Sequence, residues 1–129
     1  MSERVYEVGT SASVTAWHVM PGMEGPEGEL HSHDYRIDVV AARGDLDEHG
    51  MVCDLDVLRS ALDDIVGRLR DRNLEIILPD GAAAVTVEIF ARWVHDRLCG
   101  ALGDAGERTL RVRVWETPDA FGGYTTGGA

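Results

Sequence analysis

Residues 30–43, LHSHDYRIDVVAAR, have the alternation of one long β-strand, and two histidines lie near its start. Alternate residues of a strand point to the same face, so His31 and His33 can reach a common point. His18 lies in the preceding extended segment, and a neighbouring strand would bring it beside this pair. By spacing alone, ordinary polar strand residues are the simpler interpretation. Three neutral imidazoles with a fourth position open would, however, make a catalytic zinc site.

The periodicity of the whole chain predicts the order of its elements. We expect an extended segment at residues 3–20, a loop at 21–29, a strand at 30–43 and a turn at 44–50. Two helices should follow at residues 56–69 and 86–102, and two strands at 109–116 and 121–126. Asp54 or Asp56 is the expected N-cap of the first helix. This order predicts a single α+β domain over residues 1–129, with both helices on one face of an antiparallel sheet.

The charge of the chain excludes several classes of partner. With 12 basic and 23 acidic residues the formal net charge is −11, so no basic stripe is available for nucleic acid or an anionic membrane. All 12 basic residues are arginine, which excludes a lysine Schiff base. No apolar run reaches membrane-spanning length and the first residues lack a signal-peptide pattern, so we expect a cytoplasmic protein. Cys53 and Cys99 are then expected to be reduced, inert thiols.

Five short motifs, in the same order along the chain, resemble those of the 6-pyruvoyltetrahydropterin and 6-carboxytetrahydropterin synthase superfamily. They are VTAWH (14–18), His31-Ser32-His33, GMVCDL (50–55), Thr86-Val87-Glu88 and VWET (114–117). Each is weak alone, but together they extend over roughly residues 5–124. The resemblance implies the tunnelling fold, a four-stranded antiparallel sheet with two helices, and a zinc ion on the three histidines. It also implies homo-oligomers, trimers or stacked hexamers, with active sites at subunit interfaces.

The resemblance further implies residues that bind a small-molecule substrate. Glu116 matches the carboxylate that anchors the pterin ring, and a carboxylate can accept two parallel hydrogen bonds from the amino and ring N–H groups. Thr86 and Glu88 match residues that line the same pocket. The zinc ion would polarise a hydroxyl or carbonyl group of the substrate side chain.

Two segments depart from the family pattern. Carboxy-forming members have a catalytic cysteine four residues before the paired histidines, where this chain has Glu27. A glutamate here resembles the type III branch, which cleaves the dihydroneopterin side chain to 6-hydroxymethyldihydropterin, so Glu27 is a candidate general base. Glu24 and Glu29 lie in the same loop, so the choice of Glu27 rests on the family spacing and a solvated loop acid is the alternative.

The second departure follows the first helix, where Arg70 and Asp71 replace the Asp–His pair of the family. Arginine cannot act as a base. The usual proton relay is therefore absent or rebuilt around Asp71, which either transfers protons or forms an ion pair with the flanking arginines.

Three functions remain open on these grounds. The first is a zinc-dependent carbon–carbon lyase acting on a dihydroneopterin-type side chain. The second is a repurposed family member that uses the zinc site for cyclisation, dehydration or isomerisation of a non-pterin carbonyl compound in specialised metabolism. The third is a non-catalytic oligomer that binds a pterin or another metabolite. Of the remaining histidines, His49 is expected in a solvated loop and His95 on the surface of the second helix.

Overall fold

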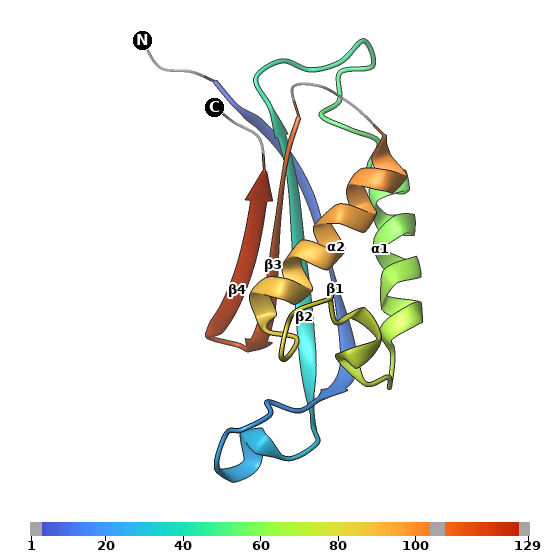
Figure 1. Ribbon diagram of the computed structural model, residues 1–129. Helices are drawn as coiled ribbons and strands as arrows, with labels where there is room; N and C mark the ends of the chain where they lie inside the picture. Colours follow the sequence, from blue (N-terminus) through green and yellow to red (C-terminus); the bar gives the residue numbers. More distant parts are fainter. Residues whose placement is uncertain (1–3, 104–107, 127–129) are drawn as a thin grey trace.

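The computed structural model describes residues 4–103 and 108–126, and its centre is a four-stranded antiparallel sheet (Figure 1). The strands lie side by side in chain order: β1 (Tyr6–His18), β2 (His31–Arg43), β3 (Thr109–Thr117) and β4 (Ala120–Thr126). The ladder between β1 and β2 runs from Tyr6 opposite Arg43 to His18 opposite His31. The prediction of four antiparallel strands is confirmed.

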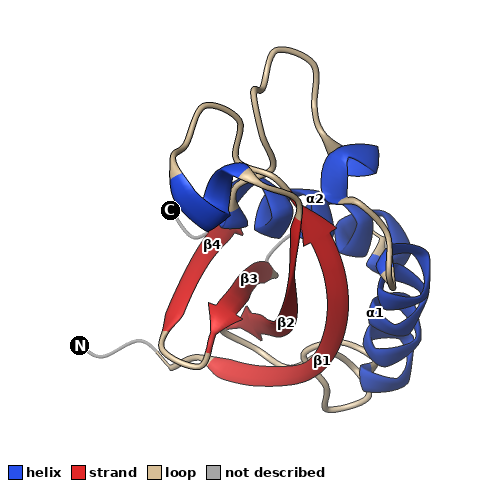
Figure 2. Cartoon of the chain, turned by 90° about the horizontal axis from the view of Figure 1, so that it is seen from below, coloured by secondary structure: helices blue, strands red, loops and turns tan. Residues whose placement is uncertain are grey.

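Two helices join the halves of the sheet and pack on the same face of it (Figures 1 and 2). Helix α1 (Leu55–Leu69) contacts β1, and α2 (Val87–Leu102) contacts β3 and β4. Asp54 caps α1 by accepting hydrogen bonds from two backbone N–H groups, and Thr86 caps α2 by accepting one from Ile89. These caps satisfy N–H groups that the first helical turn leaves free. Both predicted helices are confirmed.

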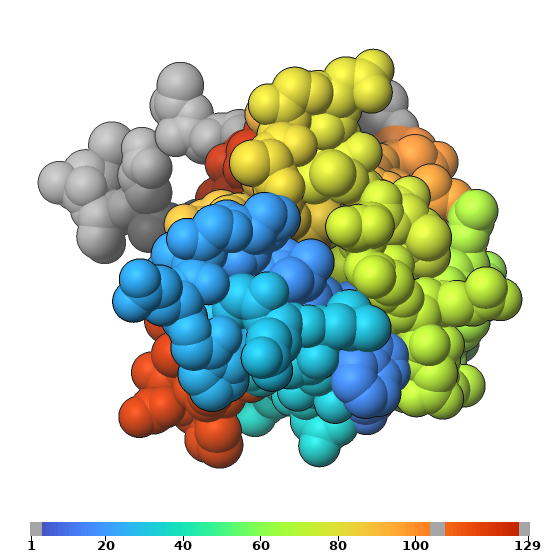
Figure 3. Space-filling view, turned by 60° about the horizontal axis from the view of Figure 1, so that its bottom comes forward, coloured from blue at the N-terminus to red at the C-terminus, as the bar shows by residue number. Residues whose placement is uncertain are grey.

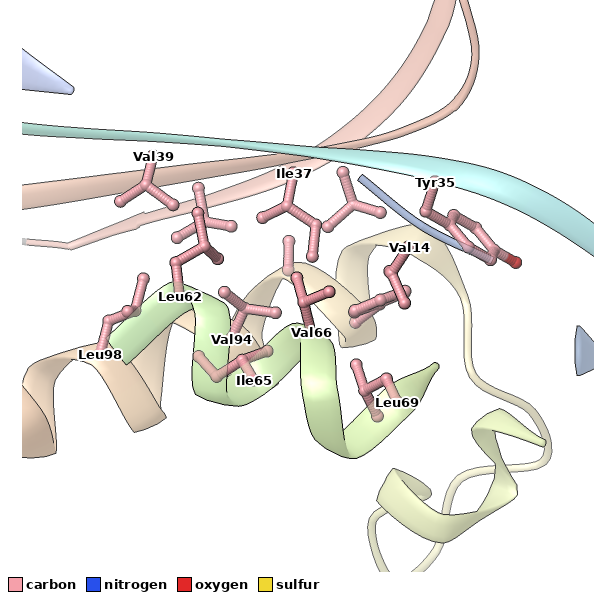
Figure 4. Close-up of a cluster of buried hydrophobic side chains, with 14 of the residues drawn as sticks. Val14, Tyr35, Ile37, Val39, Leu62, Ile65, Val66, Leu69, Val94 and Leu98 are labelled. Carbon is pink, nitrogen blue, oxygen red and sulfur yellow. The ribbon is translucent and has the colours of Figure 1, made fainter. Parts of the chain in front are cut away.

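The core lies between this face of the sheet and the helices (Figure 4). Alternate residues of β2 are buried from Tyr35 through Ile37 and Val39 to Ala41, as the two-residue period of a strand requires. Most of the buried helix residues are apolar and lie three or four positions apart, among them Leu58, Leu62, Ile65, Leu69, Phe90, Val94 and Leu98. Because His31 and His33 continue the alternation of β2, they lie on the core face at its end.

The structure also contains two short 3-10 helices that were not predicted, η1 (Gly25–Gly28) and η2 (Leu74–Ile77).

Between α1 and η2 the chain runs along the outer edge of β1. Asp71, with a left-handed backbone (φ 58°), donates its N–H to the carbonyl oxygen of Thr15, and Trp17 donates its N–H to that of Arg72. Aspartate is one of the few residues that adopt this conformation readily. The segment after α1 is thereby held beside the end of β1.

The expectation of a surface position for His95 is wrong. His95 is only 4% exposed, because it lies on the face of α2 that packs against β4. The two ring nitrogens lie 2.9 Å from Asp96 Oδ1 and 2.6 Å from Thr126 Oγ1, and such partners make a buried polar side chain tolerable. His49 is exposed in its loop, as expected. No helix in the described ranges is both long and apolar enough to cross a bilayer.

Candidate metal centre and adjoining cavity

Strand β1 ends and β2 begins at one end of the sheet (Figure 1). Because β1 ends at His18 and β2 begins at His31, the three histidines lie at this end. His18 is paired directly with His31 in the ladder, and His33 follows two residues later on the same face. The ring centroids are 4.4 Å apart for His18 and His31, 4.8 Å for His31 and His33, and 5.2 Å for His18 and His33. The arrangement of the strands thus brings three imidazoles to one point.

Ring nitrogens of all three histidines are buried there without a hydrogen-bond partner. His31 donates its Nδ1–H to the carbonyl oxygen of Glu29 at 2.7 Å, since a carbonyl can only accept. In the neutral ring this leaves a lone pair on Nε2, which is one of the unpartnered atoms. The others are both ring nitrogens of His18 and Nε2 of His33. Orphaned buried nitrogens are costly, and a metal ion bound among the three rings would satisfy one nitrogen of each.

The surroundings of His18 favour its neutral form. Burial lowers its pKa, and positive charge on His31 or His33 lowers it further, whereas the carboxylates of Glu116 and Glu27 act in the opposite direction. A neutral imidazole is the form that binds a metal ion. The three imidazoles therefore suit a metal ion in their geometry, and His18 suits it in its protonation as well.

Tyr35 closes the inner side of the group. Its ring centroid lies 5.5 Å from that of His33 and 5.2 Å from that of Phe90, which belongs to the core. Burial raises its pKa well above the ordinary value, with the nearby carboxylates adding to the effect, so the phenol stays neutral. Figure 4 shows Tyr35 at the end of the core cluster, with its hydroxyl oxygen pointing away from it. Tyr35 was not among the predicted site residues, although it continues the alternation of His31 and His33.

Glu27 reaches the histidines from the loop after β1, which is blue in Figure 3. Its Oε2 lies 3.5 Å from His31 Nε2, and one ligand atom from each of Glu27 and the three histidines lies within 4.8 Å of the others. Met20 donates its N–H to the carbonyl oxygen of Glu27. A Cβ on Gly28 would lie 2.0 Å from the carbonyl oxygen of Met23, so the loop that positions Glu27 requires a glycine after it.

Glu116 approaches the same histidines from β3. The pairing of β3 with β4 shifts between Trp115 and Thr117, so Glu116 lies in a β-bulge of this strand pair. Its Oε1 lies 3.0 Å from His33 Nε2 and 3.9 Å from His18 Nε2, without hydrogen-bond geometry to either. The side chain is 30% exposed, so its oxygens are open to a ligand.

A cavity of about 650 Å³ lies beside Glu116 and His33. It forms because β2 pairs with β3 only from Arg36, opposite Trp115, onward. Residues 32–35 therefore have no β3 partner, and the outer face of the sheet opens toward the histidine group. The volume is in the range of small-molecule sites.

Three other candidate residues lie apart from this group. Asp71 lines a separate cavity with Thr15 at the edge of β1. Thr86 is occupied as the cap of α2, and Glu88 is exposed in the first turn of that helix. In the described part of the chain, none of these three lines the cavity beside Glu116 or belongs to the histidine group.

The chain was compared with known proteins by sequence. A family model described as 6-pyruvoyl tetrahydropterin synthase matches residues 7–126. A protein from Pyrococcus abyssi, named "Putative 6-carboxy-5,6,7,8-tetrahydropterin synthase", is 30% identical over 120 residues, and the match covers 74% of each chain.

Solved structures agree in fold. The 6-pyruvoyl tetrahydropterin synthase of Caenorhabditis elegans is 20% identical with a TM-score of 0.75, covering 98% of this chain and 99% of that one. The Plasmodium vivax synthase, solved as a variant with a catalytic glutamate replaced by alanine, is 13% identical with a TM-score of 0.77, covering 95% and 98%. The fold is that of these synthases, as the sequence motifs predicted. With the family model matching nearly its whole length, the chain belongs to the 6-pyruvoyl tetrahydropterin synthase family.

Proposed function

We propose that the protein is a zinc-dependent lyase that cleaves a carbon–carbon bond in the side chain of a dihydroneopterin-type substrate. The observation that carries this proposal is the group formed by Glu27 and three histidines, whose ligand atoms lie within 4.8 Å of one another. Three imidazoles are a complete protein ligand set for catalytic zinc, and the fourth group is a carboxylate at the position of the type III branch.

Zinc would be held by His18, His31 and His33, whose unpartnered nitrogens fit a metal ion. The hydrogen bond from His31 Nδ1–H to Glu29 supports this role, because it orients the ring and fixes the tautomer. When bound, zinc would supply Lewis-acid polarisation of a side-chain hydroxyl or carbonyl group.

Glu27 would act as the general base. In the cleavage it would take the proton of a side-chain hydroxyl while the adjacent carbon–carbon bond breaks and the hydroxyl carbon becomes an aldehyde. The other carbon of the broken bond stays attached to the pterin ring. Returning the proton to that carbon would give 6-hydroxymethyldihydropterin. Glu27 is half exposed and 3.5 Å from His31 Nε2, so it can contact both solvent and a bound substrate.

Glu116 would anchor the pterin ring from the wall of the cavity, accepting hydrogen bonds from ring N–H and amino groups. Asp71, Thr86 and Glu88 lie apart from the histidines of their own chain, so they would contribute by completing the site of a neighbouring copy. We accordingly propose a cytoplasmic homo-oligomer, a trimer or a hexamer.

A product assay by mass spectrometry tests this function. Zinc-loaded protein is mixed separately with dihydroneopterin and its triphosphate, and we expect 6-hydroxymethyldihydropterin from the former. Glu27→Gln should lower the rate by about 10²–10⁴-fold, the usual contribution of a general base, with zinc content unchanged. Glu24→Gln, an exposed acid at the start of η1, is the matched control and should retain activity.

A repurposed enzyme with a non-pterin carbonyl substrate is the second candidate. The position of Asp71 favours this candidate. Asp71 stands where the family has its proton relay, yet it lines a cavity other than that of Glu116. Absence of turnover of both pterins by zinc-loaded protein would reject the lyase and direct the search to such substrates.

A further inference from the structure

The carboxylate of Glu27 lies where a fourth ligand of a metal ion on the three histidines would lie. Its Oε2 is 3.5 Å from His31 Nε2. Ligand atoms of a tetrahedral zinc site, with bonds of about 2.0–2.2 Å, are separated by about 3.3–3.5 Å. One ligand atom from each of Glu27, His18, His31 and His33 lies within 4.8 Å of the other three. A small contraction of this group would therefore let one ion contact all four side chains.

The loop that carries Glu27 is fixed on both sides of it. Met20 donates its N–H to the carbonyl oxygen of Glu27 at 2.9 Å, and Glu29 donates its N–H to that of Pro26 at 3.1 Å. The carbonyl oxygen of Glu29 in turn accepts the hydrogen bond from His31 Nδ1–H. The same short segment thus positions the carboxylate and orients one imidazole, so the two ligand atoms are held close together.

The side chain of Glu27 is also free to leave this position. It is 51% exposed, so its carboxylate can turn into water without becoming an unpaired buried charge. Glu116, the other carboxylate near the histidines, belongs to the wall of the cavity and is not one of the four ligand atoms. Glu27 is therefore the carboxylate that combines reach toward the metal position with freedom to move.

We propose that Glu27 is the fourth ligand of the metal ion in the substrate-free protein and that a substrate oxygen displaces it. The inference rests on the proposed function, which places zinc on the three histidines and makes Glu27 the base. A carboxylate in the fourth position keeps solvent anions out of it. Once displaced, the carboxylate remains beside the substrate, where a general base must lie.

Cobalt spectroscopy tests this ligand without catalysis. The metal-free protein is loaded with Co2+, whose visible absorption reports on its ligands, and is titrated with azide, an anion that needs a free coordination position. If Glu27 fills that position about nine-tenths of the time, the apparent Kd of azide is raised about tenfold. We expect Glu27→Asp and Glu27→Gln each to change the spectrum and to bind azide about tenfold more tightly than the unaltered protein.

The aspartate variant separates ligation from charge. It keeps the negative charge, but its side chain is one methylene shorter and the fixed loop cannot follow. Tighter azide binding in Glu27→Gln alone, or an unchanged spectrum in both variants, would overturn the inference and leave the lyase proposal to its product assay.

Glu24→Asp, which alters an exposed acid of the same loop, is the matched control and should behave like the unaltered protein in both measurements. An effect of this control equal to that of Glu27→Asp would also overturn the inference. Failure of the unaltered protein to bind Co2+ would reject the three-histidine centre, and the proposed function would fail together with the inference.

Discussion

His18 and His31 face each other across the last rung of the β1–β2 ladder, with ring centroids 4.4 Å apart. Packing alone does not account for this pair, because both nitrogens of His18 and one of His31 are buried without a partner. An unsatisfied buried polar group costs about 1–3 kcal/mol. A metal ion shared by the pair and His33 would offset this cost.

Replacement of His31 tests the metal centre. We expect His31→Ala to lose bound zinc while remaining folded, because His31 lies at the start of β2, outside the apolar core. Metal analysis and circular dichroism measure the two properties. His49→Ala, in an exposed loop, is the control and should keep its zinc. Full zinc content in His31→Ala would reject the three-histidine site.

Glu116→Gln separates substrate binding from metal binding. The change keeps an acceptor oxygen at the bulge but removes the charge. Hydrogen bonds to charged groups contribute about 1.5–3 kcal/mol, so we expect neopterin binding to weaken by ~10- to 100-fold with zinc content unchanged. Titration and metal analysis distinguish the roles, since loss of zinc would instead identify Glu116 as a metal ligand. Glu75→Gln, exposed in η2, should leave both properties unaltered.

The packing of α2 on β4 depends on Gly122. A Cβ there would lie 2.5 Å from Val87 Cγ2 and 3.1 Å from the backbone nitrogen of Glu88. Gly122→Ala should therefore lower the free energy of unfolding by about 1–3 kcal/mol through overpacking. Gly67→Ala, in α1 with open space around it, should raise it by about 0.5–1 kcal/mol through helix propensity. Urea denaturation of both variants checks the opposite signs, and a neutral Gly122→Ala would show that the contact relaxes freely.

Asp47 makes the stability of the 44–50 turn sensitive to acid. Its Oδ1 accepts hydrogen bonds from the backbone N–H groups of Met51 and His49, and these lower its pKa. A carboxyl whose pKa is depressed on folding contributes stability above its unfolded pKa of about 3.9, and the contribution is lost as pH falls through the folded value. Asp47→Asn removes this titration. We therefore expect the free energy of unfolding to fall less steeply below about pH 4 in this variant than in the unaltered protein. Urea midpoints from pH 6 to pH 3 measure the slope, and an equal change in Asp80→Asn, at an exposed position, would contradict the assignment.

Much of the fold was predictable because strand and helix periods are local properties. The alternation of residues 30–43 placed His31 and His33 on one face, and apolar residues at helical spacing predicted both helices, with Asp54 or Asp56 as the cap of the first. The motifs around these residues also indicated the family, which the family model confirms. The position of His95 was predicted wrongly because the strand that buries it, β4, is distant in the sequence. Its contact residue in that strand, Thr126, is 31 residues away.

The sequence by itself determined the order of the strands and helices, and it determined that His31 and His33 lie on one side of their strand. Only the tertiary structure decided that His18 lies opposite His31, that η1 brings Glu27 to within 3.5 Å of His31, and that Glu116 Oε1 lies 3.0 Å from His33 Nε2. It also decided that Asp71 lies at the edge of β1, apart from the histidines. The physical reason is that strand register, loop closure and bulges depend on contacts between distant segments, whereas the side-chain period of a strand is a property of the strand alone.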